Sequence, residues 1–138
     1  MHVERAPAKL TLYLRVVGVR EDGYHLIDAE MVSLDYGDSL EIGDGDGLEV
    51  VGPCSAGVPT GKDNLVCRAL GLTGRRARVR LDKQVPAGAG LGGGSADAAA
   101  VLRWAGCDDL AVAATLGADV AFCVVGGRAR VGGVGQVV

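Results

Sequence analysis

A run of glycines near residue 90 is the part of this sequence best suited to chemistry. Residues 86–95 read Pro-Ala-Gly-Ala-Gly-Leu-Gly-Gly-Gly-Ser, and an alanine-rich segment typical of a helix follows directly. A helix start leaves backbone N–H groups unpaired and carries partial positive charge, while glycines let the chain approach an anion without Cβ clashes. The segment therefore predicts a cradle for phosphate groups, formed by Pro86, Gly88, Gly90, Leu91, Gly92, Gly93, Gly94 and Ser95.

Two familiar phosphate loops do not fit this segment. Gly88, Gly90 and Gly93 satisfy the dinucleotide spacing, but Asp108 and Asp109 open a helix where that fold needs an acidic residue at the end of a strand. No lysine follows the last glycine, as a Walker loop requires. An ordinary strand-to-helix connection seldom needs five glycines. The loop is that of another nucleotide fold, in which Ser95 either caps the helix or faces a phosphate or its magnesium ion.

The first elements along the chain are predicted strands. Apolar residues recur at every second position from Leu10 to Val16, which predicts a strand that buries them and places Lys9 and Thr11 on the opposite face. Extended chain is expected over residues 24–34, with helix not excluded. A turn at 35–38 and a second at 43–47 predict a hairpin of strands 39–42 and 48–51.

The remaining elements flank the glycine loop. Asp63 or Asn64 caps a predicted helix that ends near Gly71, and Asp108 or Asp109 caps another that stops at Gly117. The expected order after residue 60 is helix 64–70, strand 76–82, helix 95–105, helix 109–116, strand 120–125 and strand 128–131. Strands outnumber helices and the early hairpins lack helical crossovers, so we expect an α+β fold with a mixed sheet rather than a doubly wound parallel sheet.

Composition limits the range of functions. A chain of 138 residues with 49% hydrophobic content supports one domain, residues 1–138, with one core. The formal net charge of -3 argues against a nucleic-acid partner. The four cysteines are scattered without metal-ligand spacing, so we expect no metal site made by the protein. We also expect no membrane partner, since no apolar stretch is long enough to span one and no signal peptide is apparent, and hence a cytoplasmic location.

Four separated segments resemble the GHMP kinases, a superfamily of small-molecule kinases. They are residues 7–12, 20–25, 86–100 and 116–122, which occur in the family's order. The resemblance implies a ribosomal protein S5 domain 2-like fold for the N-terminal, ATP-binding half of the family. It also implies that the family's C-terminal domain is absent from this chain. Two alternatives could complete the substrate cleft of the family: a homodimer or that missing half.

The resemblance assigns roles to individual residues. It places the catalytic pair on Lys9 and Asp119, with the aspartate accepting a substrate proton and the lysine stabilising negative charge. It implies that Tyr24 and His25 recognise cytidine and that Thr11 contacts substrate. Around the adenine and ribose of ATP it places Lys83, Asn64 and Asp63. The implied cofactors are ATP and Mg²⁺.

The implied activity is ATP-dependent phosphorylation of the 2-hydroxyl of a cytidine-diphosphate-linked methylerythritol in isoprenoid precursor synthesis. Thr11, Ala121 and Gln136 depart from the residues usual in the family, which are Asn, Pro and Glu. These departures leave two alternatives open: a truncated, catalytically incompetent nucleotide-binding module, or a kinase of the same superfamily that acts on another small alcohol.

Overall fold

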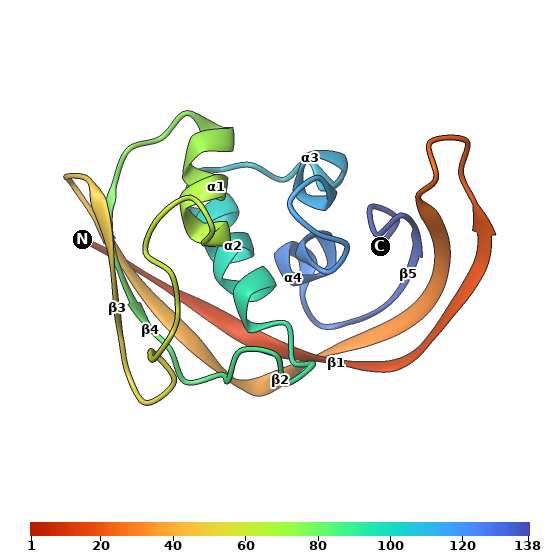
Figure 1. Ribbon diagram of the computed structural model, residues 1–138, viewed down its shortest axis with the longest axis horizontal. Coiled ribbons are helices and arrows are strands. Elements are labelled where there is room, and N and C mark those ends of the chain that lie inside the picture. Colours follow the sequence, from red (N-terminus) through yellow and green to blue (C-terminus); the bar gives the residue numbers. More distant parts are fainter.

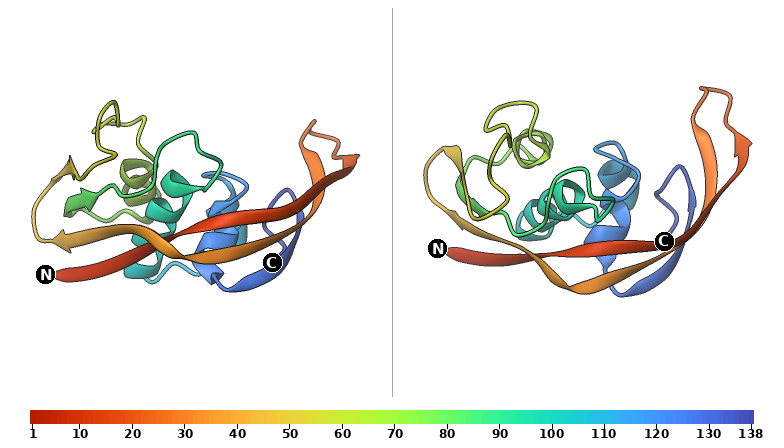
Figure 2. Two further views of the ribbon diagram at one scale, coloured as in Figure 1. Left: turned by 90° about the horizontal axis from the view of Figure 1, so that it is seen from below. Right: turned by 60° about the horizontal axis from the view of Figure 1, so that its bottom comes forward.

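A five-stranded sheet covered on one face by helices forms the architecture (Figures 1 and 2). The computed structural model describes residues 1–138. The strands are β1 (His2–Val19), β2 (His25–Gly43), β3 (Gly47–Val51), β4 (Arg78–Asp82) and β5 (Arg128–Gly133). The helices are α1 (Leu65–Thr73), α2 (Gly93–Trp104), α3 (Leu110–Ala114) and α4 (Val120–Val125). The predicted α+β class is confirmed.

The order of strands differs from the predicted hairpin. The sheet runs β1-β2-β4-β3, with β5 paired to the other end of β2, so β4 lies between the two strands expected to pair. β3 pairs with β4 in parallel, and α1 lies in the connection between them. Val79 and Leu81 of β4 are fully buried, which explains why this strand takes the inner position. The predicted hairpin of residues 39–51 is therefore wrong, although both of its strands exist.

A glycine in the middle of β2 shows why the predicted turn at residues 35–38 is wrong. β2 continues without a break to Gly43, and the pairing with β1 shifts in register between Pro7 and Lys9. A Cβ on Gly37 would lie 2.2 Å from the carbonyl oxygen of Ala6, so only glycine permits this approach of the two backbones. The turn-like residues form an irregularity inside a long strand, which is a feature that bulges commonly produce.

β1 buries a different face from the one its sequence pattern predicts. Ala6, Ala8 and Lys9 are buried, whereas the apolar stripe is solvent-exposed by 43–54% and comprises Leu10, Leu12, Leu14 and Val16. Two irregularities, at Pro7/Lys9 and Thr11/Tyr13, change the phase of the strand. The far half of β1 also runs beyond the helices (Figure 1). The prediction that this stripe belongs to the core and Lys9 to the opposite, non-core face is wrong.

Helix boundaries follow side-chain and glycine caps. The Asn64 carboxamide oxygen accepts from the Val66 amide at 2.9 Å, and Gly74 ends α1 in the left-handed region, three residues beyond the predicted stop. Asp109 caps α3 as predicted. Gly92 is the N-cap of α2, so the helix begins at Gly93 and, of the two roles left open for Ser95, the capping role is wrong.

The segment predicted as a strand at residues 120–125 is helix α4. All of Val120, Ala121, Phe122 and Cys123 are buried. A continuous apolar run carries no period, so a buried strand and a buried helix read alike in the sequence. Its glycine neighbours, Gly117 before it and Gly126 after it, suit the ends of either element.

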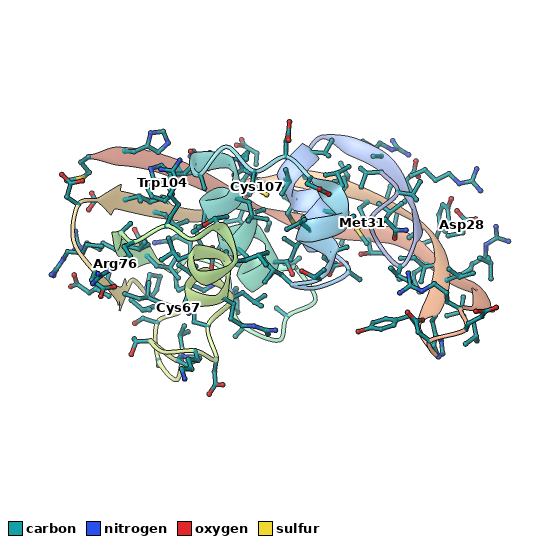
Figure 3. All side chains as sticks on the ribbon, turned by 90° about the horizontal axis from the view of Figure 1, so that it is seen from above. Asp28, Met31, Cys67, Arg76, Trp104 and Cys107 are labelled. Carbon is teal, nitrogen blue, oxygen red and sulfur yellow. The ribbon has the colours of Figure 1, made fainter.

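Alanine-rich α2 lies at the centre of the core. Eight of its residues are buried, and Ala96, Ala98, Ala99 and Ala100 let the sheet and the other helices approach closely. Larger side chains such as Met31 of β2 and Phe122 of α4 fill the space beside it (Met31 is labelled in Figure 3). None of the helices has both the length and the hydropathy needed to cross a membrane.

An ion cluster fixes the far end of the β1–β2 strand pair. The Asp28 carboxylate accepts from Arg130 Nε at 2.8 Å and from Arg15 Nη2 at 2.5 Å, which ties β2 to both of its neighbours. These two guanidinium groups hold the pKa of Asp28 well below its usual range. Asp28 lies near one end of the molecule and Arg76 near the other (Figure 3).

Candidate active site

The glycine loop has the geometry of an anion cradle. Gly88, Gly90 and Gly92 all adopt positive φ, between 65° and 77°, which residues with a Cβ reach only at a cost. No amide of residues 87–92 donates a backbone hydrogen bond, and the first bond of α2 runs from the Ala96 amide to the Gly92 carbonyl at 2.8 Å. The amides of residues 93–95 precede that bond, so they too lack a helical partner. The loop therefore presents unpaired N–H groups.

β1 holds a lysine directly beneath this loop. The Lys9 amide donates to the Leu91 carbonyl at 2.8 Å, and its side chain passes under Gly92. The Lys9 ammonium lies 3.2 Å from Asp119 Oδ2 and donates to Thr11 Oγ1 at 2.9 Å. The structure thus brings together the predicted pair of Lys9 and Asp119 with Thr11, although they are far apart in the sequence.

Asp119 lies at the start of α4, and its carboxylate does not cap that helix. It occupies the N-cap position but makes no side-chain capping bond. Its side chain is 32% exposed, while that of Lys9 is 8% exposed. A carboxylate that is partly accessible and lies beside a buried ammonium is placed to accept a hydrogen bond from a bound hydroxyl.

A second lysine belongs to a buried charge network that sequence reasoning only half identified. Lys83 Nζ donates to Asp38 Oδ2 at 2.7 Å and to Asp97 Oδ2 at 3.0 Å. The other Asp38 oxygen accepts from the amides of Gln84 and Val85 at 2.6 and 2.9 Å. Asp38 and Asp97 were not predicted as site residues, although an aspartate among the alanines of a buried helix was a usable signal.

Burial and mutual proximity shift the pKa values of this network in different directions. Burial, aided by the Asp38 carboxylate, raises the pKa of Asp97 to about 8. Burial also opposes ionisation of Asp38, but hydrogen bonds from Asp97, Lys83 and the Val85 amide outweigh it and hold that pKa below its usual value. The pKa of Lys83 is raised because Asp97 and Asp38 outweigh the effect of its burial.

A cavity of about 220 Å³ adjoins the loop and this network, and we call it the loop cavity. It is lined by Ala56, Gly57, Val58, Pro59, Asp63, Asn64, Leu65, Lys83, Ala87, Gly94 and Asp97. The three residues predicted to surround adenine and ribose all lie on its wall. Asn64 uses both ends of its carboxamide internally, since Nδ2 donates to the Pro59 carbonyl at 2.9 Å. Lys83 is likewise occupied, because it donates to Asp38 and Asp97. Asp97 lies on the same wall and was not predicted as a site residue.

A larger cavity, of about 680 Å³, lies between the β1–β2 hairpin and α3, and we call it the hairpin cavity. It is lined by Arg20, Tyr24, His25, Ile27, Ala111, Ala114, Thr115, Leu116, Gly117, Ala118, Val134 and Gln136. Tyr24 and His25 are exposed, and the Arg20 guanidinium lies over the Tyr24 ring, 5.4 Å from its centroid. Gly117 and Ala118 of its lining directly precede Asp119 in the sequence.

Gln136 is fixed at the edge of the hairpin cavity. Its Oε1 accepts from the Val134 amide at 2.7 Å, and a Cβ on Gly133 would meet the carboxamide.

The cysteines stay apart from one another and all four are free thiols. Burial raises the pKa of Cys123 to about 12, so this thiol is unreactive. The chain contains no cluster of three His, Cys, Asp or Glu residues able to hold a metal ion.

The fold and the loop resemble those of a known family of kinases. Residues 62–127 match the family described as GHMP kinases N terminal domain, and the architecture is that of this domain. At the level of particular proteins, 95–97% of the chain resembles 4-diphosphocytidyl-2-C-methyl-D-erythritol kinases. That of Paracoccus denitrificans is 48% identical over 135 residues, and that of Dinoroseobacter shibae is 47% identical over 142 residues. The matches cover 97% and 95% of this chain but 49% and 48% of the relatives.

Solved structures agree with the sequence relatives. A crystal structure of 4-(cytidine 5'-diphospho)-2C-methyl-D-erythritol kinase superposes with a TM-score of 0.73 at 40% identity, over 99% of this chain and 53% of that one. A putative homoserine kinase from Listeria monocytogenes shares the fold, with a TM-score of 0.61 at 20% identity, over 91% of this chain and 48% of that one. The chain spans about half the length of the curated relatives it matches.

Proposed function

We propose that this chain is the ATP-binding part of a kinase that phosphorylates the 2-hydroxyl of 4-(cytidine 5'-diphospho)-2-C-methyl-D-erythritol. The observation that carries the proposal is the Lys9–Asp119 pair, whose charged atoms are 3.2 Å apart where the glycine loop packs on β1. A phosphate donor on one side and an alcohol on the other would meet at this pair. The identities of 47–48% to kinases of that name support this substrate over another alcohol.

The unpaired loop amides would bind the phosphates of ATP. Phosphoryl transfer depends mostly on positioning and on charge stabilisation, and backbone N–H groups at a helix start supply both. Ser95 lies in the first turn of α2, and its hydroxyl makes no capping bond. It is the side chain available to a phosphate oxygen or to Mg²⁺. Because the chain has no acidic metal cluster, we propose that Mg²⁺ is held mainly by phosphate oxygens, where it would neutralise their charge.

Asp119 would act on the substrate hydroxyl. Its carboxylate would accept the hydroxyl proton as the hydroxyl oxygen bonds to the γ-phosphorus of ATP and ADP leaves, and Lys9 would stabilise the negative charge that develops beside it. Thr11 holds the Lys9 ammonium from the other side at 2.9 Å, so the ammonium keeps a fixed direction. The burial of Lys9 strengthens these interactions, because water is excluded around its charge.

The hairpin cavity would hold the cytidine end of the substrate. The exposed Tyr24 ring offers a face on which a base can stack, and His25 offers ring nitrogens for the edge of the base. Arg20 already covers one side of the Tyr24 ring, so the base would use the opposite side. A cytoplasmic location and a homodimer or separate C-terminal partner stay predictions.

A coupled assay of ADP release with this substrate tests the proposal. We expect turnover by the wild-type chain, alone or with a C-terminal half supplied in trans, and a loss of at least a hundredfold in Asp119→Asn with ATP affinity retained. Calorimetric titration with ATP distinguishes the second candidate, a catalytically incompetent nucleotide-binding module, which the departures at Thr11, Ala121 and Gln136 leave open. ATP binding without turnover in both conditions would support the module, and absence of ATP binding would contradict both functions.

A further inference from the structure

The turn at the tip of the β1–β2 hairpin is closed by its own hydrogen bonds. This tip stands away from the helices (Figure 1), and the last paired residues of the two strands are Val19 and His25. Between them, the Arg20 amide donates to the Tyr24 carbonyl at 2.7 Å, and the Gly23 amide donates to the Arg20 carbonyl at 2.8 Å. The backbone of the turn therefore has a defined form before any ligand binds.

Asp22 is the residue that joins this turn to the Tyr24 ring. Its Oδ1 accepts from the Tyr24 amide at 3.1 Å. The same carboxylate accepts from Arg20 Nε, at 3.0 Å to Oδ1 and 2.9 Å to Oδ2, and also from Arg20 Nη2. The Arg20 guanidinium in turn lies over the Tyr24 ring. One carboxylate thus fixes both the backbone of Tyr24 and the cation that covers one face of its ring.

These contacts leave the opposite face of the Tyr24 ring for a ligand. Tyr24 is 63% exposed, and Tyr24 and Arg20 both line the hairpin cavity, whereas Asp22 does not. An exposed ring that rotates freely must be ordered when a base stacks on it, and the lost freedom opposes binding. A ring already held by a guanidinium loses less. Asp22 is therefore placed to affect stacking without contacting the ligand.

We propose that Asp22 is a positioning residue that, through Arg20, holds the Tyr24 ring ready to stack on the cytosine base of the substrate. This inference rests on the proposed binding of cytidine in the hairpin cavity. Arginine suits the intermediate place, because its planar fork can bond a carboxylate and cover an aromatic face at the same time. The hydrogen bonds from Arg20 lower the pKa of Asp22, so its carboxylate is ionised at neutral pH.

The negative charge of Asp22 makes the direction of the effect diagnostic. Cytidine diphosphate is an anion, so removing a nearby carboxylate should, by electrostatics alone, leave its binding unchanged or strengthen it. Loss of the fixed ring should instead weaken binding. Glu21→Gln is the matched control, because Glu21 lies in the same turn, carries the same charge and takes part in none of these contacts.

Calorimetric titration with cytidine diphosphate, with the loop saturated by ATP, tests the proposal. We expect Asp22→Asn to weaken cytidine diphosphate about three- to tenfold and to leave the separately measured affinity for ATP unchanged. Glu21→Gln should bind both ligands at least as tightly as wild type. Both variants should unfold within about 2 °C of wild type, since exposed ion pairs contribute little to stability. An effect of Asp22→Asn no larger than that of Glu21→Gln would overturn the proposal.

A double-mutant cycle shows whether Asp22 acts through the Tyr24 ring. In a Tyr24→Ala background we expect Asp22→Asn to change the dissociation constant of cytidine diphosphate by less than about twofold, because the ring that it positions is gone. Arg20→Lys should reproduce most of the loss caused by Asp22→Asn, since lysine keeps the charge but has no planar fork. Additive losses in the cycle would contradict the proposal. So would wild-type affinity in Arg20→Lys, which would indicate that Arg20 acts by its charge alone.

The outcome is separable from that of the proposed function. If the wild-type chain binds cytidine diphosphate and Asp22→Asn binds it equally well, only the role of Asp22 is overturned. If the wild-type chain does not bind it, this proposal and the cytidine part of the proposed function fall together.

Nuclear magnetic resonance gives a check that needs no ligand. The ring current of Tyr24 should shift the side-chain protons of Arg20 upfield in the wild-type chain, because the guanidinium carbon lies 5.4 Å from the ring centroid. Asp22→Asn should move these resonances back towards their ordinary positions, and Glu21→Gln should not. Arg20 resonances at ordinary positions in the wild-type chain would overturn the positioning role.

Discussion

Gly92 packs against the aliphatic stem of Lys9. A Cβ built on Gly92 would lie 2.8 Å from Lys9 Cε and 3.0 Å from Cγ, closer than real Cβ contacts come. The Lys9 amide also donates a hydrogen bond to the carbonyl of Leu91, the residue before Gly92, so loop and strand are joined by two contacts. The position of the phosphate cradle and that of the lysine that pairs with Asp119 therefore depend on each other.

Substitution of Gly92 by alanine should reduce activity by more than its backbone strain explains. At φ +65° an alanine costs about 1–2 kcal/mol of stability, and its methyl group must also displace the Lys9 side chain. We expect Gly92→Ala to lower turnover at least tenfold. Gly74→Ala is the control, since Gly74 has φ +66° and nothing within 4 Å of its added Cβ.

Thermal unfolding and ADP release measure the two effects separately. Both variants should lose similar stability from strain, while only Gly92→Ala should lose turnover. An equal fall in turnover for both would show that the contact with Lys9 does not matter.

Removal of the Tyr24 ring should weaken cytidine ligands selectively. A stacked base contributes about 1–3 kcal/mol, so Tyr24→Ala should raise the dissociation constant of the cytidine diphosphate substrate roughly five- to a hundredfold. ATP binding at the loop should not change. Tyr13→Ala is the control, because Tyr13 is also exposed, at 40% against 63% for Tyr24, but does not line the hairpin cavity. Titration of both variants with each ligand checks this, and parallel losses for the two ligands would contradict it.

Local features of the fold could be predicted from the sequence because they depend on neighbouring residues. The glycine loop before α2 follows from the need for positive φ at Gly88, Gly90 and Gly92. The caps at Asn64 and Asp109 follow from side chains that bond to amides two or three residues on. Lys9 and Asp119, by contrast, were paired only through the resemblance to a family, since no pattern in the sequence joins them.

Features that depend on distant residues could not be predicted. The buried face of β1 is set by irregularities in its pairing with β2, so counting alternate residues gives the wrong phase. The Asp38–Lys83–Asp97 network joins residues 45 and 14 positions apart. β4 enters between β2 and β3 through a crossover, and a local hairpin signal contains no information about that insertion.

The exposed stripe on β1 yields a stability prediction that separates the structure from the sequence pattern. Leu12 and Leu14 are 45% and 53% exposed, so Leu12→Thr and Leu14→Thr should each change the free energy of unfolding by about 0.5 kcal/mol or less. Met31 on the neighbouring strand is fully buried, and Met31→Ala should cost about 2–5 kcal/mol. Urea unfolding of the three variants measures this. A cost above about 2 kcal/mol for either threonine variant would mean that the stripe is covered in solution.

The Asp97 carboxyl should make the protein less stable as pH rises. Its pKa is raised to about 8 by burial and by Asp38, against an ordinary value near 3.8. Between these two values the folded state holds a proton that the unfolded state has lost, so the free energy of unfolding falls with rising pH. The stabilising effect is complete below about pH 4 and is lost by about pH 8. The slope for one proton is at most about 1.4 kcal/mol per pH unit.

The other charged groups of the network do not reproduce this slope. The pKa of Asp38 is lowered, so its contribution is lost only as pH falls below the ordinary range of aspartate, and that of Lys83 is raised, away from neutrality. Asp97→Asn removes the titrating group and keeps its shape. Urea unfolding at pH 5.5 and pH 7.5 should therefore show a steeper loss of stability in the wild-type chain than in Asp97→Asn. Because the variant retains every other titrating group, parallel losses in the two proteins would show that Asp97 is ionised at both pH values.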